Sequence, residues 1–244
     1  MTYYIKYLLI ILTLSFFTCD FLHAQENIKD KNLGTWNTFN IQYSFAPKWG
    51  AMLELQTRIN KPFHELNYYE QKGGIYYNIN KNFQVLLGIG HYGTHDIDNF
   101  SDGPIVREAR IWQQFIISQY LSRLKFEHRF RIEERWQNRI FANRFRYRIQ
   151  LAVPINHEKI EAKTFFVTAF NEVFLTTKMP HFMRNRAYIG MGYQINKTFA
   201  LQAGLIHQYN YNLQKAGAKK YLFLNLNIKL EDKAQHKSQI PRVD

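Results

Sequence analysis

The sequence has 244 residues, enough for one large β domain or two small ones. Aromatic residues make up 16% of a chain whose mean hydropathy is only -0.40. This composition argues against an ordinary soluble core and favours the half-buried surface of a pleated sheet. The net charge of +13 leaves nucleic acid, an anionic membrane surface and an anionic solute as candidate partners.

The first 24 residues have the layout of a secretory signal peptide. Lys6 supplies a positive charge, residues 7–17 are apolar, and Ala24 is a small residue suited to cleavage. The apolar run is shorter than the ~20 residues of a spanning helix, which is the argument against an N-terminal anchor. The only cysteine, Cys19, follows Thr18, a poor fit to a lipobox. Cleavage after Ala24 would leave no cysteine for disulfides or metal binding.

After a short lead at residues 25–32, the dominant period is two, which is typical of strands. Most of the predicted strands have 10 to 14 residues. Strands of soluble proteins have ~5–6 residues, whereas transmembrane strands need about 9–11. Length therefore favours a membrane barrel over a soluble periplasmic β-sandwich. The eleven predicted strands are 33–45, 48–60, 68–79, 83–92, 106–119, 123–135, 144–153, 165–175, 184–195, 199–209 and 221–230.

The predicted links alternate between tight turns and longer polar loops, as in outer-membrane barrels with short periplasmic turns. The tight turns are 46–47, 80–82, 121–122 and 196–198. The longer loops are 61–67, 93–105, 137–143, 176–183 and 210–220. We therefore predict an all-β fold, an antiparallel transmembrane β-barrel of about 10–12 strands over residues 33–230, with a polar tail at 231–244. No second domain is predicted.

The count of eleven conflicts with the even strand numbers of single-chain bacterial barrels. A periplasmic turn at 46–47 would make the segment 33–45 start outside the cell. Two explanations remain open. Either residues 33–45 are not a wall strand, which gives ten strands, or one strand has been missed, which gives twelve.

Basic residues gather on one face of the central strands. Residues 107–148 contain eleven basic and four acidic side chains. An Arg or Lys on the lipid face at mid-depth would cost ~2–4 kcal/mol, so we place these charges in the lumen. The predicted lumen charge network is Glu54, Arg58, Glu108, Arg110, Arg123, Lys125, Glu127, Arg129, Arg131, Glu133, Arg135, Arg144, Arg146, Arg148, Glu172, Arg184 and Arg186.

Two roles are open for this network. It fills the lumen as an ion-pair network, with Arg184 and Arg186 as partners of Glu172, or it lines a narrow anion-preferring channel. Because four acids cannot pair eleven bases, we expect an anion or water inside. The expected partners are outer-membrane lipid, lipopolysaccharide and a small anionic solute. Nucleic acid is not expected, because the aromatic side chains face away from the arginines.

An enzyme acting on lipid or lipopolysaccharide is the alternative. It would need His128 with a serine, and Ser118 and Ser122 are near it in sequence. No G-x-S-x-G segment supports this, so no catalytic residue is assigned. His91 and His95 have a spacing that converges on a helix but not on a strand, so neither a metal site nor a cofactor is predicted.

Several segments, in order, resemble a family of predicted outer-membrane proteins, the domain-of-unknown-function family 2490. The first is Glu108-Ala109-Arg110-Ile111-Trp112-Gln113-Gln114. The others are Leu33-Gly34-Thr35-Trp36, His128-Arg129-Phe130-Arg131-Ile132-Glu133, Asn143-Arg144-Phe145-Arg146-Tyr147-Arg148, Asn171-Glu172-Val173-Phe174, Asn185-Arg186 and Gly190-Met191-Gly192-Tyr193. The resemblance implies a β-barrel in the outer membrane of a Gram-negative bacterium. It implies no activity and no oligomeric state.

Overall fold

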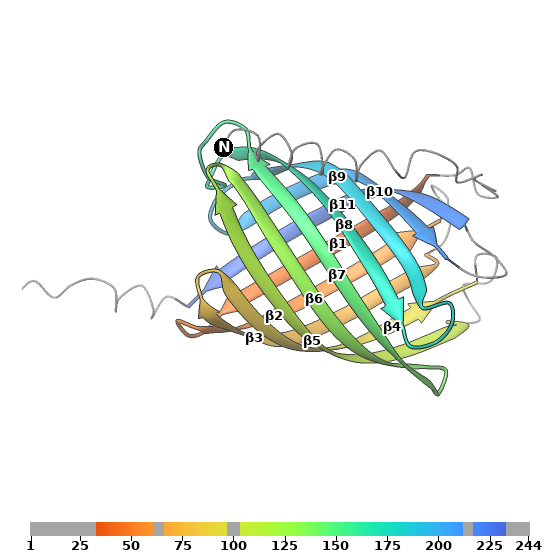
Figure 1. The fold of residues 1–244 in the computed structure, drawn as a ribbon. Coiled ribbons are helices and arrows are strands. Elements are labelled where there is room, and N and C mark those ends of the chain that lie inside the picture. Colours follow the sequence, from red (N-terminus) through yellow and green to blue (C-terminus); the bar gives the residue numbers. More distant parts are fainter. Residues whose placement is uncertain (1–32, 61–65, 97–102, 212–216, 233–244) are drawn as a thin grey trace, which may run out of the picture.

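A computed structural model describes residues 33–60, 66–96, 103–211 and 217–232. The predicted signal peptide, the lead at 25–32 and nearly all of the predicted tail lie outside these ranges. Eleven strands form one closed barrel (Figure 1). Their bounds are β1 Gly34–Ser44, β2 Trp49–Ile59, β3 Tyr68–Asn80, β4 Phe83–Thr94, β5 Val106–Leu121, β6 Leu124–Gln137, β7 Ile140–Pro154, β8 Thr164–Thr176, β9 Phe182–Gln194, β10 Phe199–Asn210 and β11 Gly217–Glu231. The predicted all-β barrel is confirmed.

The barrel closes through a parallel pair of strands. Each strand pairs antiparallel with its neighbour in sequence, except that β1 runs parallel to β11 from Gly34 beside Tyr221 to Ser44 beside Glu231. An odd number of alternating strands leaves the first and last running in the same direction, so only a parallel seam can close the wall. The two strand counts that we expected, ten and twelve, are therefore both wrong, because the barrel closes with eleven strands. Residues 33–45 do contribute a wall strand.

The two ends of the barrel differ. We call one the turn end, with the connections 45–48, 81–82, 122–123, 155–163 and 195–198, and the other the loop end, with 60–67, 95–105, 138–139, 177–181 and 211–216. Two links depart from the prediction. The expected loop at 137–143 is a two-residue hairpin at Asn138 and Arg139, both with positive φ, while the nine-residue link 155–163 lies at the turn end.

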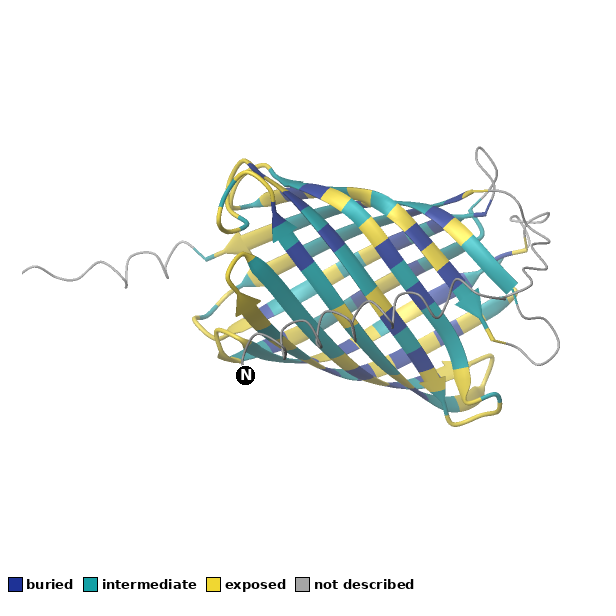
Figure 2. Cartoon of the chain, turned by 45° about the horizontal axis from the view of Figure 1, so that its top comes forward, coloured by how far each residue is buried: buried dark blue, intermediate teal, exposed yellow. Residues whose placement is uncertain are grey.

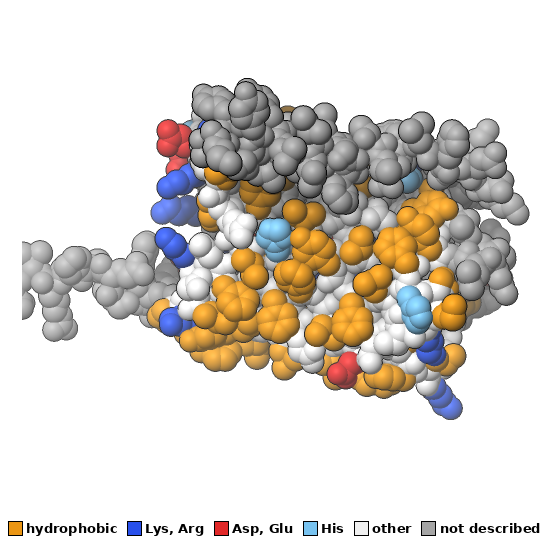
Figure 3. All heavy atoms as spheres, viewed as in Figure 1, with side chains coloured by type: hydrophobic (Ala, Val, Ile, Leu, Met, Phe, Trp, Pro, Cys, Tyr) orange, Lys and Arg blue, Asp and Glu red, His pale blue; other side chains and the backbone are white. Residues whose placement is uncertain are grey.

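The outward face of the wall is an apolar band (Figure 3). Along the strands, outward residues alternate with inward ones, many of which are buried (Figure 2). Aliphatic side chains such as Leu87, Ile89 and Ile189 are each more than half exposed although they belong to regular strands. A soluble protein of this size would bury such side chains, whereas a lipid-facing barrel wall exposes them.

Aromatic pairs flank this band at both ends. At the turn end, Trp49 packs on Tyr77 at 4.8 Å between ring centroids and Phe165 on Tyr193 at 4.5 Å. At the loop end, Phe182 packs on Tyr211 at 4.4 Å. These are the aromatic girdles of a membrane barrel. Phe182 and Tyr193 belong to the same strand, β9, and are eleven residues apart. At ~3.3 Å per residue and a tilt of ~40°, the two girdles are about 28 Å apart.

Charges on the outward face avoid this band. Among the described strand residues, the outward charged side chains are Arg107, Glu134 and Lys220, each within the four strand residues nearest the loop end. This distribution fits the depth-dependent cost of charge on a lipid face. Within the described ranges, no helix has the length and apolarity that crossing a membrane requires.

Inward glycines make room for the aromatic side chains that fill the lumen. A Cβ on Gly88 would lie 2.3 Å from the ring of Trp112 on the neighbouring strand, and one on Gly192 would lie 2.2 Å from the Phe166 ring. The rings therefore lie flat against the bare backbone. This packing narrows the lumen where β4 and β5 meet.

We expect Gly88→Ala to lower the free energy of unfolding by about 1–3 kcal/mol, because Trp112 must leave its place in a packed interior. The matched control is Gly73→Ala on β3, where the added Cβ meets only a backbone oxygen at 3.6 Å. Urea unfolding of the refolded barrel, followed by heat-modifiable gel migration, measures both. Equal stability of the two variants would show that Trp112 does not depend on Gly88.

Candidate functional site

Buried carboxylates organise the charges inside the barrel. Glu172 on β8 is 1% exposed and pairs with Arg129 at 2.5 Å, Arg146 at 2.8 Å and Arg186 at 3.3 Å. These arginines come from β6, β7 and β9. The register accounts for two of these contacts, because Arg186 lies directly beside Glu172 in the sheet and Arg129 lies in the same row, one strand beyond Arg148. One carboxylate thus ties together four strands.

A second centre is Glu133 on β6, which is fully buried. It accepts hydrogen bonds from Arg144 Nε at 2.6 Å and Arg146 Nη1 at 2.7 Å, and Arg131 lies 3.5 Å away. Arg146 therefore bridges Glu133 and Glu172. Buried charges are tolerated only when they are paired and hydrogen-bonded, and these meet that condition.

Glu108 on β5 forms a third centre nearer the loop end. Arg110 donates to both of its oxygens, at 2.7 and 2.9 Å, in a bidentate pair, and Arg135 from β6 also donates to it. Bidentate arginine–carboxylate pairs are among the strongest charge-assisted hydrogen bonds. Glu108, Glu133 and Glu172, with their arginine partners, are called the ion-pair cluster below.

A fourth carboxylate, Glu70 on β3, was not predicted. It accepts hydrogen bonds from Arg58 at 2.8 Å and Tyr68 at 2.8 Å, and it pairs with Lys72 at 2.6 Å. Lys72 also pairs with Glu54. The signal was present in the sequence, because Glu70 and Lys72 share the period-two face of Tyr68, but aromatic residues on both faces of this strand obscured it.

Aromatic rings fill the space between the arginines. Phe174, 1% exposed, has the guanidinium carbons of Arg146 and Arg186 at 4.6 and 4.8 Å from its centroid. Arg58 lies 3.5 Å from the centroid of Trp36, and Arg110 the same distance from that of Tyr92. A guanidinium that stacks on an aromatic ring is attracted to the ring face, and its own N–H edge stays free to bind a carboxylate.

The lumen is filled at the level of the ion-pair cluster. Trp112 and Glu133 have no exposure, and Tyr92 has 2%. They come from β5, β6 and β4, and Glu133 pairs with Arg144, whose guanidinium carbon lies 5.4 Å from the centroid of Phe174. Buried side chains from β4 to β8 therefore fill this part of the barrel interior. We call this filled region the seal.

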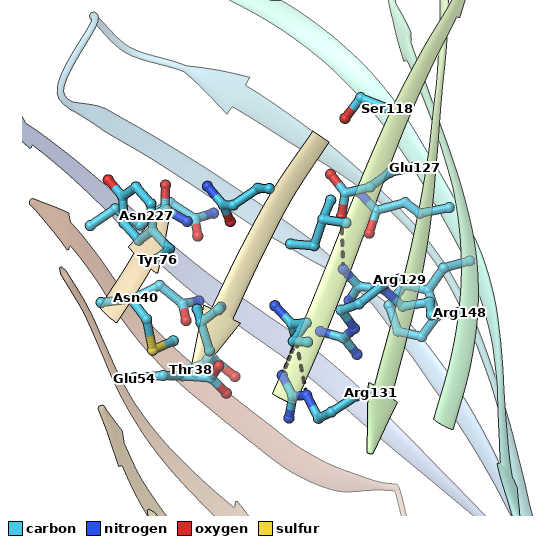
Figure 4. A pocket seen from close by; sticks show the side chains of 18 of the residues that line it. Thr38, Asn40, Glu54, Tyr76, Ser118, Glu127, Arg129, Arg131, Arg148 and Asn227 are labelled. Atoms are coloured by element: carbon cyan, nitrogen blue, oxygen red, sulfur yellow. Dashed lines mark hydrogen bonds and ion pairs between the residues drawn. The ribbon is translucent and has the colours of Figure 1, made fainter. Parts of the chain in front are cut away.

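On the turn-end side of the seal, the lumen opens into a cavity of about 450 Å³ (Figure 4). Lys81 and Phe83 line the cavity at the turn end, and Trp36, Glu70 and Glu172 line its inner end, next to the seal. Nine basic and four acidic side chains line it. The basic ones are Lys72, Lys81, Lys125, Arg129, Arg131, Arg146, Arg148, Arg186 and Lys229.

The remaining predicted lumen residues occupy three places. Arg148 and Lys125 pair with Glu127 at 3.2 and 3.6 Å on the cavity wall. Arg184 donates to Asn210 near the loop end rather than to Glu172. Arg123 is not in the cluster, because it donates to backbone carbonyl oxygens of the 155–163 link and of Pro154 at the turn end.

The predicted partners for lipid chemistry do not meet. Ser118 lies beside Glu127 and lines the cavity, whereas His128 lies beside Ile117 on the outward face and hydrogen-bonds to Tyr147 at 2.9 Å. Neighbouring residues of one strand point to opposite faces, so the wall separates the two. Among the described residues, no group of three His, Cys, Asp or Glu could hold a metal ion.

The chain is similar to one family of known sequences and to solved structures. The model of the family described as "Protein of unknown function (DUF2490)" matches residues 33–218. The NanC porin is 10% identical, with a TM-score of 0.44, covering 77% of this chain and 95% of the porin. The siderophore receptor PirA from Pseudomonas aeruginosa is 10% identical, with a TM-score of 0.30, covering 73% of this chain and 35% of the receptor. No curated protein matches the sequence.

Proposed function

The chain belongs to the DUF2490 family, whose description assigns no activity, and we propose that it is an outer-membrane barrel that binds small anions in its lumen. The anions enter from the turn end and stop at the seal. The ion-pair cluster then has a structural role, because it closes the barrel and fixes the arginines that line the cavity. The apolar band of the outward face contacts outer-membrane lipid and lipopolysaccharide.

The observation that carries this proposal is the charge imbalance of the cavity wall. Its nine basic side chains exceed its four acidic ones. Arginines with a carboxylate partner still have unused N–H donors, because each guanidinium has five. Field lines concentrate in a narrow, low-dielectric cavity, so the excess positive charge attracts anions more strongly than the same charges on an open surface.

The outer-membrane location is supported by the wall itself. A closed sheet has no free edge, so every backbone donor and acceptor of the wall is satisfied without water, as a membrane requires. The apolar band lies between aromatic girdles about 28 Å apart, which matches the ~25 Å band of the outer-membrane type. The predicted signal peptide provides the export that this location needs.

The test is conductance of the refolded mature protein in a planar bilayer, combined with anion binding in detergent. We expect a silent barrel that binds phosphate, with affinity lowered several-fold by Arg148→Gln and by raised salt. Discrete, anion-selective openings, reduced by Arg129→Glu or Arg146→Glu, would contradict the seal and support a narrow anion-preferring channel. A silent barrel without phosphate binding would reduce the lumen to a structural ion-pair network.

A further inference from the structure

The cavity has two chemically different walls. The charged wall, on β6 to β9, carries Lys125, Arg129, Arg131, Arg146, Arg148 and Arg186, with Glu127 and Glu172 as the acids. The opposite wall, on β10, β11 and β1, is amide-rich, and Lys229 is the one charged side chain among its lining residues in the described ranges. It carries Asn40, Gln42, Gln202, Asn225 and Asn227. Figure 4 shows Arg129 and Arg148 on one side of the cavity and Asn40 and Asn227 on the other.

The amides are held in a ladder across the barrel seam. Asn40 Nδ2 donates to Asn225 Oδ1 at 2.7 Å, and Asn225 Nδ2 donates to Gln202 Oε1 at 3.2 Å. The three residues come from β1, β11 and β10, which are neighbours in the wall. Each amide has two donor hydrogens and an oxygen with two lone pairs, so the ladder leaves both donors and acceptors for the cavity.

This pairing of walls selects for a particular ligand chemistry. A carboxylate only accepts hydrogen bonds, and a phosphate accepts through most of its oxygens, which suits the arginines and lysines of the charged wall. An amide oxygen needs a donor, which a carboxylate lacks. A hydroxyl group both donates and accepts, as the amide wall does. A ligand with an anionic group at one end and hydroxyl groups at the other therefore satisfies both walls.

The cavity also has room and apolar surface for such a ligand. Its volume of about 450 Å³ falls in the ~300–1,000 Å³ range of small-molecule sites. Phe170 and Phe223 line it, and Phe170 is held by a stacked contact with Tyr188 at 5.0 Å. Ring faces of this kind pack against the C–H groups of a polyol. Water and inorganic anions have no C–H groups and cannot make this contact.

We infer that the cavity binds an anionic sugar, with the acid group on the arginines of β6 and β7 and the hydroxyl groups on the amide ladder of β1, β11 and β10. This inference rests on the proposed anion-binding function and names its substrate class. Inorganic anions bind the charged wall alone and are held more weakly. Neutral sugars lack the charged contact and are also weak.

The experiment is isothermal titration calorimetry of the refolded full-length mature barrel in detergent with five probes. They are D-glucuronate, D-glucose 6-phosphate, acetate, phosphate and D-glucose. We expect at least one of the sugar acids to bind ten-fold more tightly than its parent anion, and glucose not to bind measurably. Comparing the affinity for glucuronate with that for glucose 6-phosphate shows whether the cavity prefers a carboxylate or a phosphate as the acid group.

Variants separate the two walls. Asn227→Leu and Asn40→Leu should lower the affinity for the sugar acid more than that for the parent anion, whereas Arg148→Gln should lower both. Asn171→Leu, on the outward face, is the control and should change neither. Heat-modifiable gel migration establishes that each variant is folded. The two leucine substitutions test the amide-rich wall on two different strands, β11 and β1.

The outcomes distinguish this inference from the proposed function. Equal affinities for sugar acids and their parent anions overturn the inference and leave the anion-binding function standing. Binding of glucose as tight as that of glucuronate also overturns the inference, because the charged wall would then not be needed. Failure of every probe to bind overturns both.

Discussion

Replacing Glu172 by Gln is expected to lower the free energy of unfolding by about 3–5 kcal/mol. The substitution keeps the shape of the side chain but leaves Arg129, Arg146 and Arg186 without their shared carboxylate. Three like charges would then face one another in a site that is 1% exposed to solvent. Removing one partner of a buried ion pair is far more costly than never having had the pair.

The matched control is Glu127→Gln. Glu127 also pairs with two basic residues, but its side chain is 17% exposed on the cavity wall, and its distances of 3.2 and 3.6 Å are longer. We expect a loss of at most about 1 kcal/mol there. Urea unfolding in detergent, followed by tryptophan fluorescence, measures both. Comparable losses for the two variants would show that Glu172 does not organise the cluster.

The alternation of charged and apolar residues along the central strands identifies their inward face from the sequence. On β6 and β7, nearly all charged residues occupy one face and most apolar residues the other, so Arg129, Arg146 and Glu133 could be assigned to the lumen. On β3, Tyr69 and Tyr77 lie outward while Tyr68 and Tyr76 lie inward. The contrast between faces disappears there, which is why Glu70 and Lys72 were missed.

The partner of each charge could not be read in the same way. Arg186 follows Glu172 on the next strand, so its pairing with Glu172 was predictable from the hairpin. Arg129 reaches Glu172 from two strands away, and Arg184 is drawn instead to Asn210. Such contacts depend on the stagger and curvature of the closed wall. The seal was beyond prediction for the same reason, since it depends on how Glu133, Arg144 and Phe174 from three different strands pack together.

Loop lengths were misjudged where polar residues continue a strand past the membrane band. Residues 137–143 are mostly polar and were assigned to a loop, yet β6 and β7 extend to a two-residue turn. Asn138 fixes this turn, because its side chain accepts from the backbone N–H of Arg107 at 3.0 Å and donates to the carbonyl of Ile105 at 3.2 Å. Outside the lipid, polarity no longer distinguishes strand from loop.

The parallel seam predicts that the two ends of the described wall face opposite sides of the membrane. Leu33 precedes β1 at the loop end, whereas Asp232 follows β11 at the turn end. An even-stranded barrel would put both on the same side. We expect Leu33→Cys and Asp232→Cys, each in a Cys19→Ser background, to differ in their labelling of intact cells by a membrane-impermeant maleimide.

With short turns in the periplasm, the cysteine at 33 should be labelled in intact cells and the cysteine at 232 only after the outer membrane is permeabilised. The difference should be nearly all-or-none, because the wall separates the two sites. The reverse pattern would keep the seam but invert the barrel, so that the basic cavity would open to the outside. Labelling of both cysteines from one side would refute the eleven-stranded closure, and with it the assignment of Asn40 and Asn225 to neighbouring strands of one amide wall.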